Sequence, residues 1–289
     1  MNDTLQYLIG RYISEPISAP AQWDLTRLDP GVADVFEYDS LQTLPLATMR
    51  TAIHAGLAYL ACIGLLYLMM KTVAPIRLWF VGLLHNVVLV VGSAWMAWGL
   101  ASAAWKVLIS PFGWKEAICA SHVRLDYAGE LTYFMYVYYL SKYLEFADTI
   151  LMIVLRKRSL TVLHLFHHSI IAPLSLLWIT GGWTLAWIGA FMNTVIHVFM
   201  YSHYALALVD GVGFRYKRYL TSAQIAQFFT VFCLINLHGV LSYTGVGNCH
   251  GDPAVAIASQ MVNVAFLALF VNFYLQSYTK KTTLKRKND

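Results

Sequence analysis

Three histidines within five residues are the best candidates for chemistry in this sequence. His164, His167 and His168 form an H-x-x-H-H run in a mostly apolar stretch. Side chains three or four positions apart share one face of a helix, so we expect these imidazoles to lie together. An imidazole exchanges protons near neutral pH, and it can accept an acyl group or bind a metal ion. The run therefore predicts a functional site.

Polar side chains recur at helical spacing in three other apolar stretches. Charged and strongly polar groups are costly in the hydrocarbon of a bilayer, and those found there usually face a functional interior. An ion pair within one helix and hydrogen bonds between helices remain alternative explanations for the carboxylates and glutamines. By contrast, His54, His85 and His238 are isolated, and we expect packing or local hydrogen bonding from them. The recurring positions are Lys142, Glu145, Asp148 and Thr149; then Asn193, His197, Met200 and Tyr201; then Thr221, Gln224 and Gln227.

These side chains require a helical frame inside a membrane. The chain is 58% hydrophobic and 12% charged, with a mean hydropathy of +0.57, which leaves too little polar surface for a water-soluble globule. A helix needs about 20 mainly apolar residues to cross a bilayer, so we predict an all-α protein, a single bundle of seven transmembrane helices. The expected spans are roughly 51–70, 79–101, 130–154, 161–180, 184–207, 221–244 and 254–277.

Basic residues predict the orientation of this bundle, because lysines and arginines next to helix ends stay on the cytosolic side. The predicted domains are a lumenal N-terminal arm (1–50), the transmembrane catalytic domain (51–278) and a basic cytosolic tail (279–289). With a rise of about 1.5 Å per residue, Asp148, His167, His197 and Gln224 all lie within about 16 Å of the cytosolic ends of their helices. They predict one polar chamber open to the cytosol. The basic residues on that side include Lys71, Arg77, Arg156, Lys157, Arg158, Arg215, Lys217 and Arg218.

Loop and terminal residues bear on the cellular compartment. Asn2 begins an Asn-Asp-Thr glycosylation sequon on the predicted lumenal arm. Lys285 and Lys287 stand fifth and third from the end, as in dibasic retrieval signals of the endoplasmic reticulum, although a solvated basic tail is an alternative. Cys119 and Cys249 fall in loops on the oxidising side, so the topology permits a disulfide between them, but the sequence alone does not show that they meet.

The polar motifs resemble those of the fatty acid elongases of the endoplasmic reticulum, membrane condensing enzymes also called very-long-chain 3-ketoacyl-CoA synthases. One position departs from the family pattern, in which x-Tyr-Tyr usually follows the Met-Tyr pair, whereas this chain has His203 before Tyr204. The resemblance extends from the first predicted span to the tail. Its four ordered signatures are Lys142-x-x-Glu145-x-x-Asp148-Thr149, His164-x-x-His167-His168, Asn193-x-x-x-His197-x-x-Met200-Tyr201 and Thr221-x-x-Gln224-x-x-Gln227.

The resemblance implies condensation of a long-chain acyl-CoA with malonyl-CoA, which gives a 3-ketoacyl-CoA, carbon dioxide and CoA. His167 would attack the thioester to form an acyl-imidazole with His197 as its partner, while His164 and His168 orient the site and stabilise the oxyanion or enolate. Glu145 and Asp148 would fix the tautomers of the imidazoles, and Lys142 would neutralise the charge of these two carboxylates. The remaining expected contacts to substrate come from Thr149, Asn193, Tyr201, Gln224 and Gln227.

The same resemblance implies acyl-CoA and malonyl-CoA as substrates, with no cofactor and no metal. Membrane lipid and the other elongation-cycle enzymes, a ketoreductase, a dehydratase and an enoyl reductase, are the expected partners. A homodimer is left open, and no nucleic acid is expected. Candidate ligands for the CoA phosphates are Arg156, Lys157, Arg158, Arg215, Lys217 and Arg218, which positive-inside topology also explains.

Two other functions use similar residues. A di-iron desaturase or hydroxylase also has H-x-x-H-H motifs, but it needs several such boxes, and this chain has one box plus His197 and His203. A proton-coupled transporter can use buried carboxylates and histidines as a relay. Transporters often show paired broken helices related by a repeat, and the sequence shows no such pair.

Overall fold

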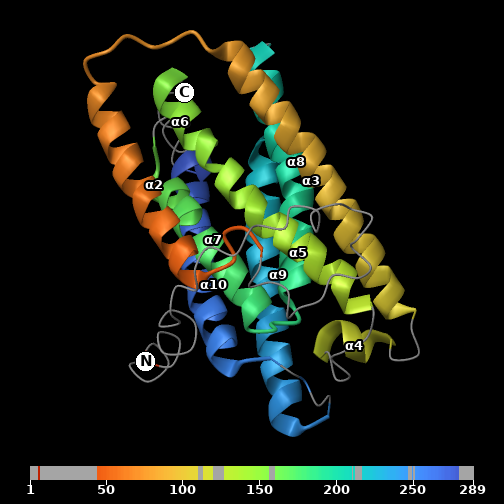
Figure 1. Ribbon diagram of the computed structural model, residues 1–289. Coiled ribbons are helices and arrows are strands. Elements are labelled where there is room, and N and C mark those ends of the chain that lie inside the picture. The colour runs from red at the N-terminus through yellow and green to blue at the C-terminus, as the bar shows by residue number, and fades with distance from the viewer. Residues whose placement is uncertain are drawn as a thin grey trace.

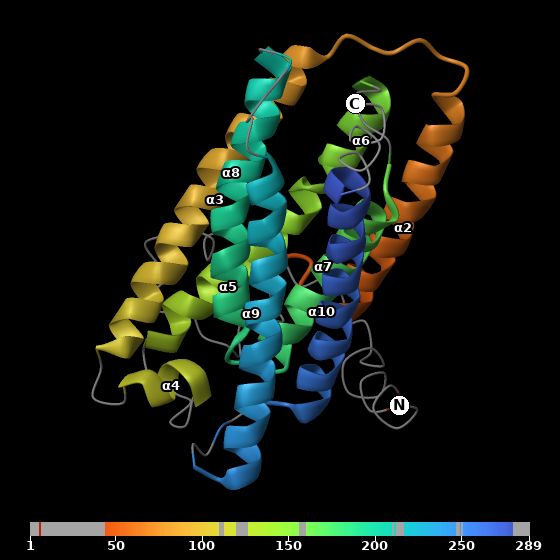
Figure 2. The same ribbon diagram turned by 180° about the vertical axis from the view of Figure 1, so that it is seen from behind.

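The computed structural model describes residues 6, 44–109, 113–119, 127–155, 160–209, 211, 217–246, 249 and 251–279. All regular structure in these ranges is helical. Figures 1 and 2 show the long helices packed side by side in one bundle, with successive helices running in opposite directions. The elements are α2 (Met49–Met69), α3 (Trp79–Leu108), α4 (Gly113–Cys119), α5 (Tyr127–Leu144), α6 (Phe146–Leu155), α7 (Val162–Thr180), α8 (Ala186–Val209), α9 (Lys217–Thr244), α10 (Pro253–Tyr274) and the π-helical turn η5 (Leu275–Thr279).

Five of the described helices are long and apolar enough to cross a membrane: α2, α3, α7, α9 and α10 with its π-helical extension. The predicted all-helical, multi-spanning character is therefore confirmed at this level. The helices α5, α6 and α8 are not among the five. Helix α6 has only 10 residues, α5 carries several tyrosines with Glu130 and Lys142, and α8 carries Asn193, His197 and His203, all of which lower hydropathy. Helix α6 is therefore excluded by its length, whereas α5 and α8 carry much of the polar pattern.

The third predicted span requires a correction, because it is two helices. Helix α5 ends at Leu144 and α6 begins at Phe146. At the junction, the backbone N–H of Asp148 donates to the carbonyl of Glu145 at 3.0 Å, a three-residue spacing that tightens the turn. This junction lies in the middle of the Lys-x-x-Glu-x-x-Asp-Thr motif, so the motif's carboxylates are presented by a local break.

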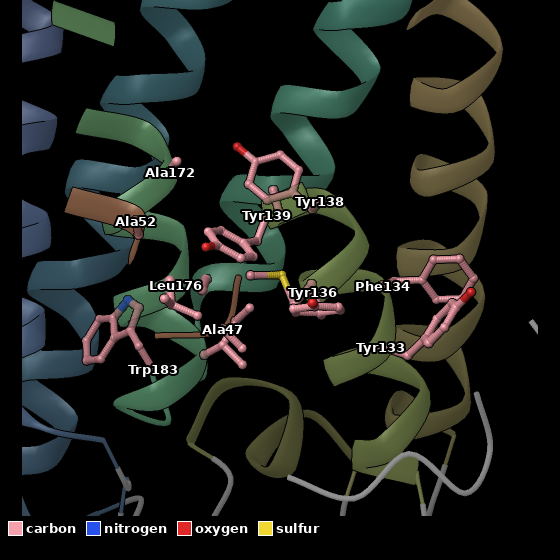
Figure 3. Packing of buried hydrophobic residues seen from close by; sticks show 14 of the residues in the cluster. Ala47, Ala52, Tyr133, Phe134, Tyr136, Tyr138, Tyr139, Ala172, Leu176 and Trp183 are labelled. Carbon is pink, nitrogen blue, oxygen red and sulfur yellow. The ribbon is translucent and has the colours of Figure 1, made fainter. Parts of the chain in front are cut away.

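Helix α5 lies in the centre of the bundle, and its tyrosines tie it to its neighbours. Figure 3 shows Phe134 and Tyr133 on the side of α3. Buried tyrosines need partners for their hydroxyl groups. The Tyr136 hydroxyl donates to the Pro45 carbonyl, and the Tyr139 hydroxyl donates to the Leu46 carbonyl. These contacts hold the segment before α2 against the core.

A close approach between α2 and α7 places the histidine run. Pro173 lies inside α7 and has no backbone N–H, so the Ser169 carbonyl four residues earlier loses its helical partner. Gly56 of α2 packs directly against that carbonyl, since a Cβ at Gly56 would lie 2.6 Å from the Ser169 oxygen. The missing side chain therefore lets α2 reach the part of α7 that follows His168.

We predict that Gly56→Ala destabilises the protein by about 1–3 kcal/mol, the usual range for overpacking, because a backbone carbonyl cannot turn aside. Gly64→Ala is the matched control on the same helix, since nothing lies within 4 Å of a Cβ there. Thermal unfolding of both purified variants in detergent measures the difference. Equal midpoints for the two variants would contradict the close approach.

The opposite end of α7 is tied to two loops. Cys119, at the end of α4, forms a disulfide with Cys249, so the pairing that the predicted topology permits is present in the structure. Thr184 and Trp187 donate side-chain hydrogen bonds to the carbonyls of Ile118 and Ala117, at 2.8 and 3.0 Å. The turn between α7 and α8 is thereby fixed to α4.

Candidate active site

A buried ion pair lies at the junction between α5 and α6. The Lys142 Nζ lies 2.6 Å from the Glu145 Oε1, and both side chains are almost completely buried. The same ammonium donates to the Asn193 Oδ1 at 3.3 Å, and the Tyr138 hydroxyl donates to that oxygen at 3.0 Å. Asn193 of α8 thus continues the network that Lys142 begins on α5.

The carboxylate of Glu145 also reaches the fifth predicted span. Its Oε1 lies 3.4 Å from the His197 Nδ1. The sequence predicted His197 as the partner of His167, and the structure places it against this carboxylate. A carboxylate next to one ring nitrogen of an imidazole fixes its tautomer and orientation. Glu145 therefore lies where it can fix the tautomer of His197, which is the role predicted for it.

Asp148 contacts a histidine from a distant part of the sequence. The His85 Nε2 lies 2.7 Å from the Asp148 Oδ1, and the Tyr201 hydroxyl donates to the Oδ2 at 2.7 Å. His85, expected to make only packing or local contacts, instead links α3 to α6 across 63 positions of sequence. Both carboxylate oxygens of Asp148 are thus engaged, which holds its side chain in one orientation.

Thr149 positions the first histidine of the run. Its hydroxyl lies 2.7 Å from the His164 Nε2 and 2.8 Å from the Tyr59 hydroxyl. Thr161 caps α7, because its Oγ1 accepts from the backbone N–H of His164 at 3.2 Å. The cap and the Thr149 contact together fix both the backbone and the ring of His164. Tyr59 is a further participant that the sequence did not single out.

The three imidazoles of the run lie against one another. The ring centroids of His164 and His168 are 4.3 Å apart, and those of His167 and His168 are 5.1 Å apart. His167 packs on Phe266 of α10, with ring centroids 5.4 Å apart. His164 contacts Thr149, and the neighbouring Asp148 accepts a hydrogen bond from Tyr201 of α8. The run, the ion pair and α8 therefore form one cluster.

A cavity begins at His167 and follows the helices away from it. The space between its atoms, open solvent included, is about 660 Å³. Its walls come from residues spaced by three or four along each helix, so it lies between α7, α8, α9 and α10 and runs parallel to their axes. His167, Asn193 and Gln227 line one part, and aliphatic and aromatic side chains line most of the rest. The α7 positions are His167, Ile171, Leu174 and Trp178; the α8 positions are Ala186, Gly189 and Asn193; the α9 positions are Gln227, Phe228, Val231, Leu234 and Ile235.

Only some of the predicted site residues line this cavity. Its lining includes His167, Asn193 and Gln227, whereas the other histidines, Lys142 and the carboxylates lie behind or beside it. Gln224 lies one turn before Gln227, and its side-chain nitrogen contacts the Met200 Sδ at 4.0 Å. The polar cluster therefore lies at the end of an apolar channel where His167 is found. Such a channel suits a long apolar molecule with a reactive polar end.

Two of the predicted phosphate ligands lie in described parts of the chain. Lys217 and Arg218 are exposed at the start of α9. The Arg218 Nε donates to the Tyr274 hydroxyl at 2.6 Å, which places its guanidinium against the end of α10. Arg156, Lys157, Arg158, Arg215 and Asn2 lie outside the described residues.

The positions of the cysteines and of possible metal ligands bear on two alternatives, a cysteine nucleophile and a di-iron centre. Cys62 and Cys233 are exposed on the outer faces of their helices, and Cys119 and Cys249 are joined. None of these four cysteines lines the cavity. Within the described ranges, no group of three or more histidine, cysteine, aspartate or glutamate side chains is placed to hold a metal ion. The di-iron alternative therefore finds no ligand set in those ranges.

The sequence of this chain is similar to those of known proteins. The family described as ELO: GNS1/SUR4 matches residues 44–286. Fatty acid elongase A of Dictyostelium discoideum is 31% identical over 90% of this chain and 95% of its own length. Fatty acid elongase sre1 of the same organism is 29% identical over 87% and 92%. The very long chain fatty acid elongase 6 of Gallus gallus is 35% identical over 61% of this chain and 65% of its own.

Proposed function

The chain belongs to the ELO (GNS1/SUR4) family and is an enzyme of fatty acid elongation, and on this premise we propose that it catalyses the condensing step. The reaction joins a long-chain acyl-CoA to malonyl-CoA and gives a 3-ketoacyl-CoA, carbon dioxide and free CoA. The observation that carries the proposal is the position of His167 at the polar part of an apolar channel. A thioester carbonyl next to His167 would leave the alkyl chain in the apolar part.

The first half-reaction transfers the acyl group to His167. A ring nitrogen attacks the thioester carbonyl, a carbon–nitrogen bond forms, and the carbon–sulfur bond breaks so that CoA leaves as its thiolate and takes up a proton. The neighbouring imidazoles of His164 and His168 are suited to stabilise the oxyanion that develops. A histidine nucleophile agrees with the cysteine positions, because the thiols of Cys62 and Cys233 are on the outer faces of α2 and α9.

The second half-reaction forms the new carbon–carbon bond. Loss of carbon dioxide from malonyl-CoA leaves its electron pair as an enolate, which attacks the acyl carbon and expels the imidazole of His167. His197, held by Glu145 at 3.4 Å, is suited to exchange the protons that these steps release and consume. The apolar walls of the channel exclude water and so protect the acyl-imidazole from hydrolysis.

Placement in the cell follows from the same proposal. We take the α5–α6 pair and α8 as additional crossing segments, which gives seven spans with a lumenal N-terminus and a cytosolic C-terminus. This orientation puts the Cys119–Cys249 disulfide on the oxidising side. The endoplasmic reticulum is the proposed location, where a ketoreductase, a dehydratase and an enoyl reductase would act on the product.

An assay with membranes that contain the expressed chain tests this function. Given an acyl-CoA panel and malonyl-CoA with carbon-13 at its methylene carbon, the enzyme is expected to yield 3-ketoacyl-CoA two carbons longer than each accepted substrate, with the label at the new position. Mass spectrometry of the thioesters measures both, and membranes without the chain are the control. A product of unchanged length and two hydrogens fewer would indicate the desaturase instead, and absence of label from every thioester would overturn the proposal.

A further inference from the structure

The channel ends at two tryptophans, Trp178 in the last turn of α7 and Trp183 in the turn between α7 and α8. Trp178 and Trp183 both line it, together with Leu185 and Ile235. The turn passes through Gly182, whose φ of +60° is a left-handed conformation that favours glycine. The Trp183 backbone N–H then donates to the Trp178 carbonyl at 2.9 Å, which brings the two residues together. Since His167 is near the other end of α7, the indoles lie at the far end of the channel.

Trp183 is packed against α9 and against the segment before α10. Gly251, with a φ of +133°, packs on its ring, because a Cβ at Gly251 would lie 3.2 Å from the Trp183 Cε3. Cys249, two residues earlier, is joined by the disulfide to Cys119. The His238 ring lies 4.6 Å from that of Trp183, and the tryptophan is only 6% exposed. The indole therefore has little room to move out of the way.

Trp178 is fixed by a polar contact. Its Nε1 donates to the Ser259 Oγ of α10 at 2.8 Å. This bond crosses the end of the channel and joins α7 to α10. The far end is thus a floor of two indoles, one bonded to α10 and the other backed by a disulfide-tied loop.

The position of this floor gives an approximate length. Trp178 follows His167 by 11 positions of the same helix, which corresponds to about 16 Å at a rise of 1.5 Å per residue. An extended alkyl chain with carbon–carbon bonds of about 1.5 Å advances about 1.25 Å per carbon. The axial separation between the reactive imidazole and the floor therefore corresponds to the length of about 13 carbons of an extended chain.

We propose that Trp183 is the residue that limits the length of the acyl chain, and that the wild-type floor excludes substrates much longer than about 14 carbons. The inference rests on the proposed condensing function. A chain that is too long would have to displace an indole that Gly251 and the disulfide-tied loop hold in place. Each methylene that fails to fit in an apolar pocket lowers kcat/KM by about tenfold, so the limit should be sharp.

The test measures product lengths with saturated acyl-CoA substrates of increasing length and labelled malonyl-CoA. Trp183→Ala removes an indole that extends about 5 Å beyond its Cβ, so we expect the longest accepted chain to grow by about four carbons. The rate with the first excluded wild-type substrate should rise by at least about tenfold. Gly189→Leu fills the channel between the two ends, where the nearest atom to a Cβ is 3.7 Å away, and should shorten the longest accepted chain.

Trp98→Ala is the control, because Trp98 is 75% exposed on α3 and lies outside the channel. It should leave the length profile unchanged. Labelled product from the wild type with the same profile in Trp183→Ala would overturn the limit while the condensing function stands. No labelled product from the wild type with any chain length would overturn the function itself. If Trp183→Ala does not accumulate as folded protein, the Gly189→Leu profile decides: a shorter limit supports the channel, and an unchanged limit contradicts it.

Discussion

Replacement of His167 by alanine is expected to lower the rate of condensation by at least about 10⁴-fold, the scale at which loss of a covalent nucleophile acts. His167 is the histidine of the run that lines the channel, where a substrate carbonyl can reach it. Its neighbours cannot substitute for it, because His164 is engaged by Thr149 at 2.7 Å and His168 is buried behind it. The measurement is the release of labelled 3-ketoacyl-CoA at saturating malonyl-CoA.

His54→Ala provides the matched control for this result. His54 lies exposed on α2, outside the cavity and the histidine cluster, and its loss should leave the rate within about twofold of wild type, as for surface substitutions in general. Equal thermal midpoints for the two variants would show that His167→Ala acts on chemistry. If His167→Ala made product at the wild-type rate, His167 would not be the nucleophile.

Separation of the Lys142–Glu145 pair is expected to have the largest effect on stability. Either Lys142→Met or Glu145→Gln leaves a charge without its partner in a site with almost no exposure, and such losses cost about 3–5 kcal/mol. The double variant Lys142→Met/Glu145→Gln removes both charges and should regain a large part of that free energy. The double variant should nevertheless be inactive, because His197 then lacks its carboxylate. Thermal unfolding of the four proteins completes a double-mutant cycle.

An exposed ion pair of the same length is the control for the buried one. Lys106 and Glu130 are also 2.6 Å apart, but the lysine side chain is 47% exposed. Lys106→Met should therefore cost no more than about 1 kcal/mol. If Lys142→Met and Lys106→Met lowered the free energy of unfolding equally, burial would not be the reason that the Lys142–Glu145 pair matters.

The helices themselves could be predicted closely from the sequence. Apolar length determines where a chain can cross a bilayer, and six of the seven expected spans correspond to single helices, the exception being 130–154. Their bounds agree within about four residues, except that α3 continues seven residues beyond the expected end at 101. The break at Glu145 was missed because the helical period of the polar residues continues through it. A tightened turn leaves no mark in such a pattern. The short helix α4 was missed because it is far too short to span a membrane.

The site was predictable where its residues lie on one helix, and less so where they meet across helices. Spacing placed the three histidines of the run together, as the ring distances show. His85 and Tyr59 stand alone in their segments, so their contacts to Asp148 and Thr149 became visible only in the folded bundle. The same holds for Trp183, whose place at the channel end depends on the turn after α7. A single apolar residue carries no signal of which cavity it will line.

Detection of an acyl group on His167 tests the central claim most directly. The purified protein is mixed with acyl-CoA in the absence of malonyl-CoA, quenched, digested and analysed by mass spectrometry. We expect the acyl mass on the peptide that contains His167, its loss when malonyl-CoA is added, and its absence from His167→Ala. An acyl group found on Cys62 or Cys233, or no acyl-enzyme while product is still made, would contradict the histidine mechanism.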